Sequence, residues 1–315
     1  MRMIRVGWLV RAVSRTVLAG APLWASGCSG ASEDGRGART FASPEEAVEA
    51  LTEAGETDDT EALQALFGQG AEDLLSSGDS VSDRNQREVV TLALRQRWNL
   101  EETETGERVL VIGYEEWPFP VPLVQDQEGW RFDIAAGKEE VLARRIGRHE
   151  LRVIETCLTY VRAQKIYASR PHDDRPAGLY AQRMTSREGE HDGLYWRATP
   201  GVRRSPLGDL AAEAEAAGYA EGEGGPRPFH GYYFRILTAQ GEAVPGGAKS
   251  YVQNGDMVGG FALVAYPAEY GDSGIMTFVV NKDGIVYEKD LGERTEELAR
   301  AMTEYSPDAS WEPAE

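Results

Sequence analysis

The stretch Gly231-Tyr-Tyr-Phe-Arg-Ile-Leu-Thr238 decides the fold class of this chain. Aromatic and branched apolar side chains alternate along it with a period of two, which is the spacing of a β-strand. Two further runs, 260–267 and 275–281, have the same character. Lys282-Asp283-Gly284 then leads into a β-branched run over 285–289, and a short glycine-ended loop between such runs predicts a hairpin. The region therefore predicts an antiparallel sheet.

A helix is predicted upstream of this sheet, over residues 144–168. It carries four apolar side chains at helical spacing, namely Leu151, Ile154, Leu158 and Val161. One apolar stripe needs a flat apolar partner, and the sheet supplies it. We therefore predict a helix lying across the sheet with these four side chains buried. Cys157 lies beside them and is interpreted as a small core residue rather than a nucleophile. Shorter helices are predicted over the alanine-rich 209–217 and from Thr295 onward.

Residues 41–136 have a different pattern, in which helices come before strands. Ser43-Pro44-Glu45-Glu46 predicts a capped helix start, and two short helices are expected over 41–67. A third helix is expected to end near Trp98, followed by strands separated by glycine and proline. This element order is similar to that of the nuclear-transport-factor-2-like cone. The chain is thus predicted to be α+β, with an N-terminal domain over 41–136 and a helix-on-sheet domain over 137–315.

The first 27 residues are predicted to be a secretory signal. They contain four arginines, no acidic residue and a short apolar run that ends in small residues. The sequence Ala25-Ser26-Gly27-Cys28 resembles a bacterial lipobox, in which the cysteine is acylated and becomes the new N-terminus. Cys28 is therefore the expected lipid anchor to the membrane, followed by a small, polar tether to residue 40. An ordinary secretory signal that ends near a cysteine is the alternative.

Ser29 follows the predicted anchor where an aspartate would indicate inner-membrane retention, so the outer membrane is the expected location, with the globular part in the periplasm or at the cell surface. Removing the four arginines of the signal takes the formal charge from −19 to −23. Such a charge argues against nucleic acid as a partner, because phosphate binding needs clustered cations. Two cysteines in 315 residues exclude a disulfide-rich scaffold.

Several strings identify a family resemblance over about residues 41–311. They include FASPEEAV (41–48), WPFPVPLV (117–124), RRIGRHEL (144–151), HGYYFRILTAQG (230–241) and SPDASW (306–311). They closely resemble the domain of unknown function 2950 family, a family of secreted or lipid-anchored bacterial proteins with no assigned activity. The resemblance implies an envelope location and supplies no catalytic residues. Within it, AQKIYA, GYYF and TFVVNKDG look like the globular part of type IV pilins and pseudopilins.

Candidate chemistry is sparse. Gly271-Asp272-Ser273-Gly274 looks like the nucleophile motif of trypsin-like proteases, which needs an imidazole base and a carboxylate to orient it. His191 or His230 could serve as that base, but a turn between two strands explains the motif equally well. The four histidines lack metal-ligand spacing, so no metal and no cofactor is predicted.

Two functions from different classes remain open. The first is a non-catalytic binding or scaffolding module for an envelope protein or a glycan, using an aromatic surface. Its candidate residues are Trp117, Phe119, Tyr195, Trp196, His230 and Tyr232. The alternative is an envelope hydrolase that acts on cell-wall or glycan substrate through His191 or His230 and a nearby acid. Residues 117–122 are either packed at a sheet edge or form an aromatic shelf, because their prolines exclude an interior strand.

Overall fold

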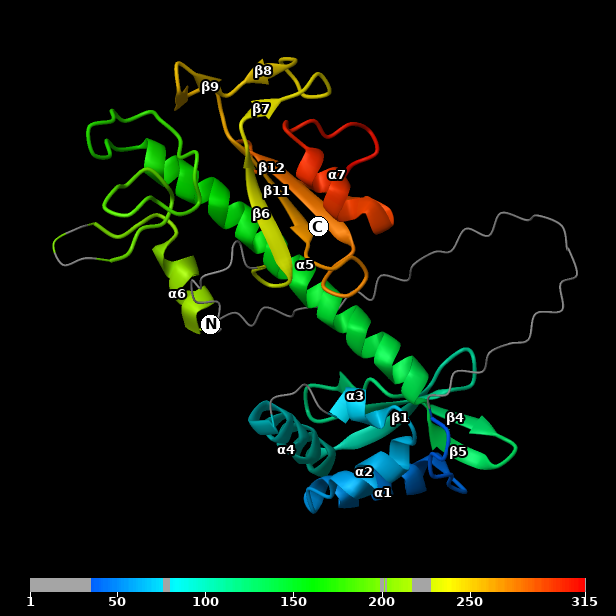
Figure 1. Cartoon of the computed structure of the whole chain (residues 1–315). Helices are drawn as coiled ribbons and strands as arrows, with labels where there is room; N and C mark the ends of the chain where they lie inside the picture. Colours follow the sequence, from blue (N-terminus) through cyan, green and yellow to red (C-terminus); the bar gives the residue numbers. More distant parts are fainter. Residues whose placement is uncertain (1–34, 76–79, 199–200, 202, 217–227, 315) are drawn as a thin grey trace, which may run out of the picture.

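The computed structural model describes residues 35–75, 80–198, 201, 203–216 and 228–314, in which two packed units share one long helix (Figure 1). Each unit has its own cluster of buried apolar side chains: one spans Phe41 to Ile134 and the other Val153 to Tyr305. The α+β class predicted from the sequence is confirmed, with helices packed on antiparallel sheets in both units.

The N-terminal unit begins with four helices: α1 (Pro44–Glu56), α2 (Thr60–Phe67), α3 (Ala71–Leu75) and α4 (Ser80–Gln96). Ser43 caps α1 by accepting a hydrogen bond from the Glu46 amide at 3.2 Å, and Asp59 caps α2 from the Ala62 amide at 2.9 Å. The two helices over 41–67 are confirmed, with the predicted cap at Ser43; the cap at Asp59 was not predicted.

The antiparallel sheet of this unit contains β1 (Trp98–Glu102), β2 (Arg108–Ile112), β4 (Leu123–Asp126) and β5 (Gly129–Phe132), in the order β1-β2-β4-β5. The short β3 (Trp117–Pro118) also pairs with β2. It is only two residues long, because the prolines that follow supply no donors for a longer ladder. Of the two alternatives for residues 117–122, this pairing agrees with packing at a sheet edge.

Helix α5 (Ile134–Ala168) connects the two units as one continuous element of 35 residues. Asp133 caps it by accepting a hydrogen bond from the Ala136 amide at 3.2 Å. The helix therefore begins ten residues earlier than the predicted start at Arg144, although its predicted end near Ala168 is confirmed. The predicted domain boundary at residue 136 falls within its first turn.

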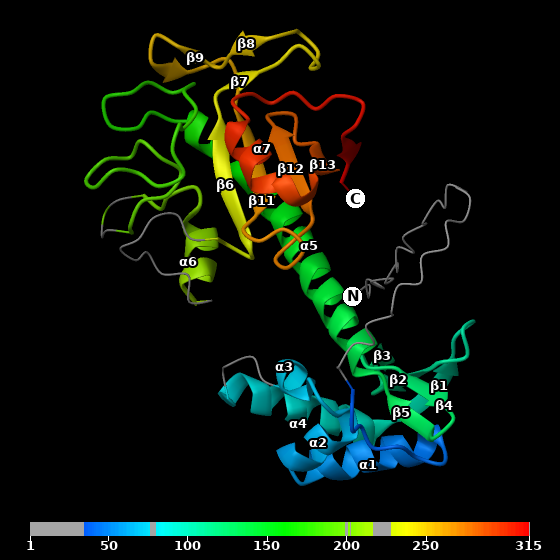
Figure 2. The ribbon, with the colours of Figure 1, turned by 45° about the vertical axis from the view of Figure 1, so that its right-hand side comes forward.

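The C-terminal unit is a five-stranded antiparallel sheet in the order β14-β13-β12-β11-β6. Its strands are β6 (Tyr232–Leu237), β11 (Ala262–Pro267), β12 (Met276–Asn281), β13 (Val286–Asp290) and β14 (Glu312–Pro313). The hairpin predicted at 282–284 is confirmed as the β12–β13 pair. Every residue of β11 is buried, because α5 covers one face of the sheet and α7 (Thr295–Ala301) covers the other (Figure 2).

The remaining elements of this unit lie around the sheet. They are α6 (Gly208–Ala216), the 3₁₀ turn η1 (Gly292–Arg294) and the two-residue strands β7 (Ala239–Gln240), β8 (Lys249–Ser250), β9 (Val252–Gln253) and β10 (Asp256–Met257). Arg235 on β6 donates to the carbonyls of Ala299 and Met302, both at 2.6 Å. Both carbonyls lie at the C-terminal end of α7, so the arginine fixes that helix on its sheet.

The predicted buried face of α5 is wrong in part. Leu151 is 63% exposed and Leu158 is 37% exposed, whereas Val161 is buried as predicted and Ile154 is half-buried. The face that packs on the sheet instead carries Val153, Cys157, Tyr160, Val161, Gln164 and Tyr167. Tyr160 and Gln164 on this face form hydrogen bonds inside the core. The face predicted from apolar spacing alone is therefore displaced from the observed one by about one residue along the helix.

Two neighbouring residues of α5 attach the helix to different units. Arg144 donates to the Pro118 carbonyl at 2.8 Å, and its guanidinium lies 5.3 Å from the centre of the Trp117 ring, so it contacts β3 of the N-terminal unit. Arg145 forms an ion pair with Asp272, in the loop between β11 and β12 of the C-terminal unit, at 2.5 Å. The attachment thus changes from one unit to the other within one residue.

Candidate functional site

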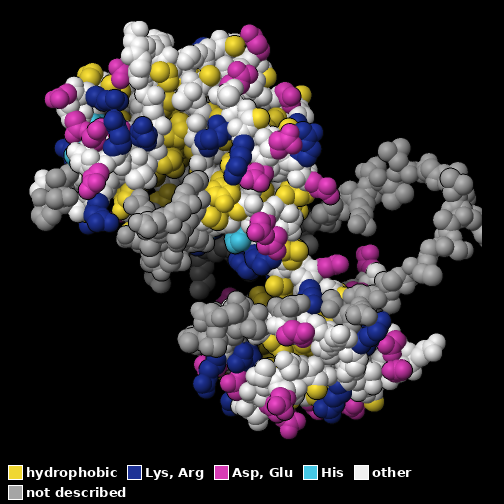
Figure 3. Space-filling model, viewed as in Figure 1, with side chains coloured by type: hydrophobic (Ala, Val, Ile, Leu, Met, Phe, Trp, Pro, Cys, Tyr) yellow, Lys and Arg dark blue, Asp and Glu magenta, His cyan; other side chains and the backbone are white. Residues whose placement is uncertain are grey.

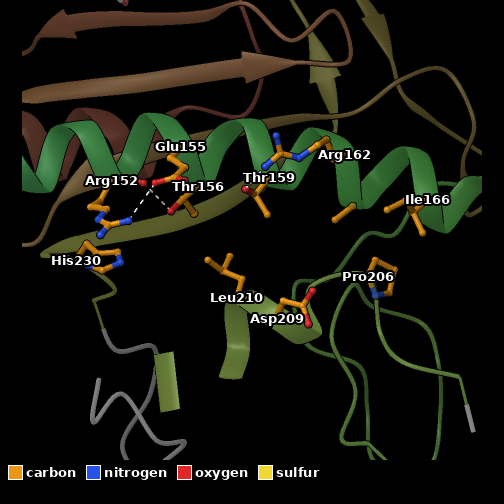
Figure 4. A pocket seen from close by; sticks show the side chains of 11 residues that line it. Arg152, Glu155, Thr156, Thr159, Arg162, Ile166, Pro206, Asp209, Leu210 and His230 are labelled. Atoms are coloured by element: carbon orange, nitrogen blue, oxygen red, sulfur yellow. Dashed lines mark hydrogen bonds and ion pairs between the residues drawn. The ribbon is translucent and has the colours of Figure 1, made fainter. Parts of the chain in front are cut away.

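A cleft of about 350 Å³ lies between the middle of α5 and α6 (Figure 4). One wall is a face of α5, and the other is α6 with the residue Pro206 that precedes it. His230, two residues before β6, lines one end. The α5 residues that line it are Arg152, Glu155, Thr156, Thr159, Arg162, Ala163 and Ile166, and the facing ones are Asp209 and Leu210. Their spacing of three and four residues puts the α5 set on one side of the helix.

The two ends of the cleft differ in chemistry. Arg152, Glu155 and His230 lie at one end in Figure 4, and Ile166 and Pro206 lie at the other. Arg152 pairs with Glu155 at 3.2 Å. Ile166 is 50% exposed, which is unusual for an isoleucine and places an apolar surface on the wall of the cleft. The cleft therefore offers charged and hydrogen-bonding groups at one end and an apolar surface at the other.

The basic side chains of the cleft are held differently. Arg152 has a carboxylate partner in Glu155, whereas Arg162 donates from Nη2 to the Thr159 hydroxyl at 2.8 Å. Within the described part of the chain, Arg162 forms no ion pair. On the face seen in Figure 3, acidic and basic side chains are intermixed over both units. Of the two arginines that line the cleft, Arg162 is therefore the one without a carboxylate partner.

The six predicted surface residues do not form one surface. Trp117 and Phe119 belong to the N-terminal unit, and the other four belong to the C-terminal unit. Of all six, only His230 lines the cleft. Trp117 is 36% exposed on β3 but is covered on one side by Arg144, and Phe119 is buried.

Burial also removes two of the C-terminal residues from the predicted surface. Tyr232 is fully buried and donates from its hydroxyl to the Met276 carbonyl at 3.0 Å. Trp196 is 8% exposed and donates from Nε1 to the Arg203 carbonyl at 2.9 Å. Tyr195 is half-buried. Aromatic rings with one polar atom serve here as core residues whose polar atom has a partner, a role that composition alone does not separate from a binding surface.

The Gly271–Gly274 motif is a docking turn in this structure. Both hydrogen bonds of the Ser273 hydroxyl join it to the backbone of Glu269, at 3.0 and 3.1 Å. His149 lies nearby but donates from Nδ1 to the Ser273 carbonyl at 2.8 Å and not to its hydroxyl. Glu150 accepts the amides of Ile275 and Met276, both at 3.0 Å. The motif thus attaches the β11–β12 loop to α5, and its serine is not activated by a base.

One imidazole–carboxylate pair does occur. His191 Nδ1 donates to Asp173 at 2.7 Å, and the His191 amide donates to the other oxygen of that carboxylate at 2.8 Å. These two bonds lower the pKa of Asp173. The His191 ring meets Trp196 edge-on, with 4.9 Å between ring centres. Such a bond to Nδ1 leaves Nε2 as the basic nitrogen, which is the arrangement of a positioned general base.

Comparison with family models decides the relationship of the chain. The model described as "Protein of unknown function (DUF2950)" matches residues 38–314. The chain belongs to the DUF2950 family. Comparison with curated proteins gives no match, and comparison with solved structures gives none. The similarities to nuclear transport factor 2 and to pilins therefore stay predictions.

Cys157 of this DUF2950 member is a core residue. Its side chain is fully buried on the sheet-facing side of α5, and burial raises the pKa of its thiol to about 12. A thiol that stays protonated at neutral pH is a poor nucleophile, because the thiolate is the reactive form. The interpretation of Cys157 as a packed residue is confirmed.

Neither a metal cluster nor a membrane span is found in the part of the chain that the structure describes. No three His, Cys, Asp or Glu side chains there are grouped so that they could hold a metal ion. No helix there is long and apolar enough to cross a bilayer. Cys28, the predicted lipidation site, lies outside the described residues.

The sequence analysis missed most of the cleft. Its residues carry ordinary helix-surface side chains, and of the cleft residues only His230 was among the predicted ones. The available signal was the spacing of Arg152, Glu155, Thr159 and Arg162, which places them on one side of the predicted helix. Their facing wall comes from a helix more than 40 residues downstream, and no local pattern predicts that contact.

Proposed function

We propose that this DUF2950 member is a lipid-anchored, non-catalytic binding protein of the cell envelope, whose ligand occupies the cleft between α5 and α6. The observation that carries the proposal is the cleft itself, in which charged, hydroxyl and apolar side chains converge from two helices. The serine and cysteine that could act as nucleophiles are engaged elsewhere: Ser273 in a turn and Cys157 in the core.

The test of this binding role is site-specific photo-crosslinking in cells. A photoreactive residue replaces Leu210, on the α6 wall, and a matched variant carries it at Leu92, which is 58% exposed on α4 of the N-terminal unit. We expect an adduct from position 210 and none from position 92. Adding Ile166→Glu, on the opposite wall, should abolish the adduct. Equal labelling at both positions, or insensitivity to Ile166→Glu, would contradict the proposal.

The anchoring part of the proposal rests on the sequence. A basic, acid-free start, an apolar run and a small-residue ending at Cys28 support acylation of that cysteine and an outer-membrane location. We expect Cys28→Ala to move the protein from the membrane fraction to the soluble periplasmic fraction. A variant that remains with membranes after washing in high salt would argue against the lipid anchor.

A second candidate function, hydrolysis of cell-wall or glycan substrate, is favoured by the His191–Asp173 pair alone. Its test is the release of soluble fragments from purified cell-wall sacculi. A hydrolase of this kind would lose activity in His191→Gln and Asp173→Asn and keep it in His149→Gln, since His149 bonds a turn carbonyl. If the wild-type protein releases nothing, this candidate fails.

A further inference from the structure

The α5–α6 cleft holds an arginine whose donors are largely free. The guanidinium of Arg162 folds back along α5 toward Thr159 in Figure 4 and gives one hydrogen bond to its hydroxyl at 2.8 Å. A guanidinium has five N–H donors, so this contact leaves most of them available. The other arginine of the cleft, Arg152, is already paired with Glu155. Arg162 is therefore the position at which a ligand anion would find unengaged donors.

The surroundings of Arg162 limit the charge of that anion. Glu155 and Asp209 also line the cleft, and both side chains are acidic. Glu155 is paired with Arg152, and Asp209 lies 3.9 Å from Arg204 with its side chain fully exposed. Arg162 is therefore the one arginine of the cleft whose charge no carboxylate balances, and one positive charge matches a ligand with one negative charge better than a phosphate ester with two. A single carboxylate, in contrast, matches the planar guanidinium in a two-bond geometry, and the Thr159 hydroxyl can donate to it as well. Charge and geometry together favour a monocarboxylate.

The apolar part of the cleft sets the rest of the ligand. Ala163 and Ile166 follow Arg162 on α5, and Pro206 and Leu210 face them from the other wall. In Figure 4, Ile166 and Pro206 lie at the same end of the cleft, and Leu210 lies on α6 below Thr156 and Thr159. A volume of about 350 Å³ is at the lower end of the usual range for ligand cavities. The ligand body is thus small and apolar.

We propose, on the basis of the binding role proposed above, that the cleft binds a small monocarboxylate with an apolar body, such as the free carboxyl end of a short peptide. Arg162 and Thr159 receive the carboxylate, and Ile166 and Leu210 hold the body between the two helices. The hydrogen bond already present between Arg162 and Thr159 orients the guanidinium before the ligand arrives, which lowers the entropic cost of binding.

The test uses paired probes that differ only in charge. N-acetyl-Ala-Leu carries a terminal carboxylate, and N-acetyl-Ala-Leu-amide lacks it. Binding of both is measured by calorimetry and by NMR shifts of the cleft residues. We expect the carboxylate probe to bind about tenfold or more tightly than the amide, a difference of about 1.4 kcal/mol, because one charge-assisted pair distinguishes them.

Substitutions in the cleft assign that difference to Arg162. Arg162→Gln should abolish the preference for the carboxylate, and Ile166→Ala should weaken both probes equally. Arg148→Gln removes the same charge from an exposed position on the same helix outside the cleft and should change neither. All three positions are exposed on α5, so the variants are expected to fold.

The outcomes separate this inference from the binding role. Equal binding of the two probes in the cleft, or a preference that survives Arg162→Gln, overturns the carboxylate inference and leaves the binding role in place. No binding of the carboxylate probe at millimolar concentration also overturns the inference, and the crosslinking at Leu210 then decides the binding role independently.

Discussion

The two cores of the molecule differ in the polarity of their buried side chains. In the N-terminal unit the buried side chains are aliphatic or aromatic, and Trp130 alone among the described core members carries a polar side-chain atom. In the C-terminal unit the core contains six tyrosines, and the buried polar side chains of the described residues all lie at position 156 or beyond. The first core is almost entirely apolar, whereas the second contains polar side chains that form hydrogen bonds.

The difference teaches how α5 is oriented on its sheet. Gln164 is fully buried, donates to the Ala181 carbonyl at 2.8 Å and accepts the Ala181 amide at 2.9 Å. Tyr160, one turn earlier, donates to the Ala262 carbonyl at 3.1 Å. Rotating the helix to bury Leu151 and Leu158 would break these bonds and leave the groups unpaired inside the core. Polar partners, more than apolar area, select the buried face.

The largest expected effect concerns the reactivity of the Cys157 thiol, which lies in the core of the C-terminal unit. Burial raises its pKa from 9.0 to about 12, so at pH 8 its thiolate fraction, and thus its alkylation rate, should fall about a thousandfold. We expect this retardation in native Cys28→Ser protein and full reactivity in denaturant. Alkylation at the rate of a free thiol in the native state would show that the core is not closed.

The same shift predicts a pH dependence. Because the native pKa lies above the unfolded one, the contribution of the thiol to stability is complete below about pH 9 and is lost as the pH rises toward about 12. The difference in unfolding free energy between the wild type and Cys157→Ala should change over this interval. A difference that stays constant would argue against the shift.

Gln164→Ala tests the polar selection of the helix face directly. It leaves both backbone groups of Ala181 without their partner, so we expect the C-terminal unit to lose about 3 kcal/mol of unfolding free energy. Hydrogen exchange during urea denaturation should report the loss in β11 and not in β2. Gln253→Ala, at an exposed position on β9, is the matched control and should change stability by less than about 0.5 kcal/mol.

Alanine substitutions at two glycines of α5 are expected to change stability in opposite directions, one in the N-terminal core and one outside it. A Cβ at Gly137 would lie 2.7 Å from a methyl carbon of Val121, so Gly137→Ala should cost about 1–3 kcal/mol in the N-terminal unit. A Cβ at Gly147 meets nothing within 4 Å, so Gly147→Ala should stabilise the helix by about 0.5–1 kcal/mol. Thermal denaturation of both variants checks the two signs, and a destabilised Gly147→Ala would be inconsistent with open space there.

Leu158→Gln has the smallest expected effect. This side chain is 37% exposed, so its replacement should change the unfolding free energy by less than about 1 kcal/mol. Val153→Ala, at a fully buried position on the same helix, should cost about 1–3 kcal/mol. If the two variants lose stability equally, Leu158 is packed after all and the helix face is the one predicted from apolar spacing.

The sequence predicted elements where local chemistry determines them. Ser43 caps a helix, the glycine-ended loop at 282–284 forms a hairpin, and the predicted run at 260–267 contains the strand Ala262–Pro267. The start of α5 was missed, because Gly137 lies in its first turn and weakens the helical pattern there. The orientation of α5 and the cleft depend on contacts with Ala181, Ala262 and α6, which are distant in sequence. Local periodicity carries no information about such partners.

The change of attachment between Arg144 and Arg145 has a consequence for the geometry of the whole chain. Because α5 passes through both units without a break, the angle between them is encoded as helical phase, at 100° per residue. Inserting seven residues at this point would return the phase to within about 20°, whereas inserting two would turn one unit by about 200° relative to the other. Insertions or deletions of seven residues in this helix therefore preserve the relative orientation of the two units best. Arg144 and Arg145 mark the position between the units at which such a change would act.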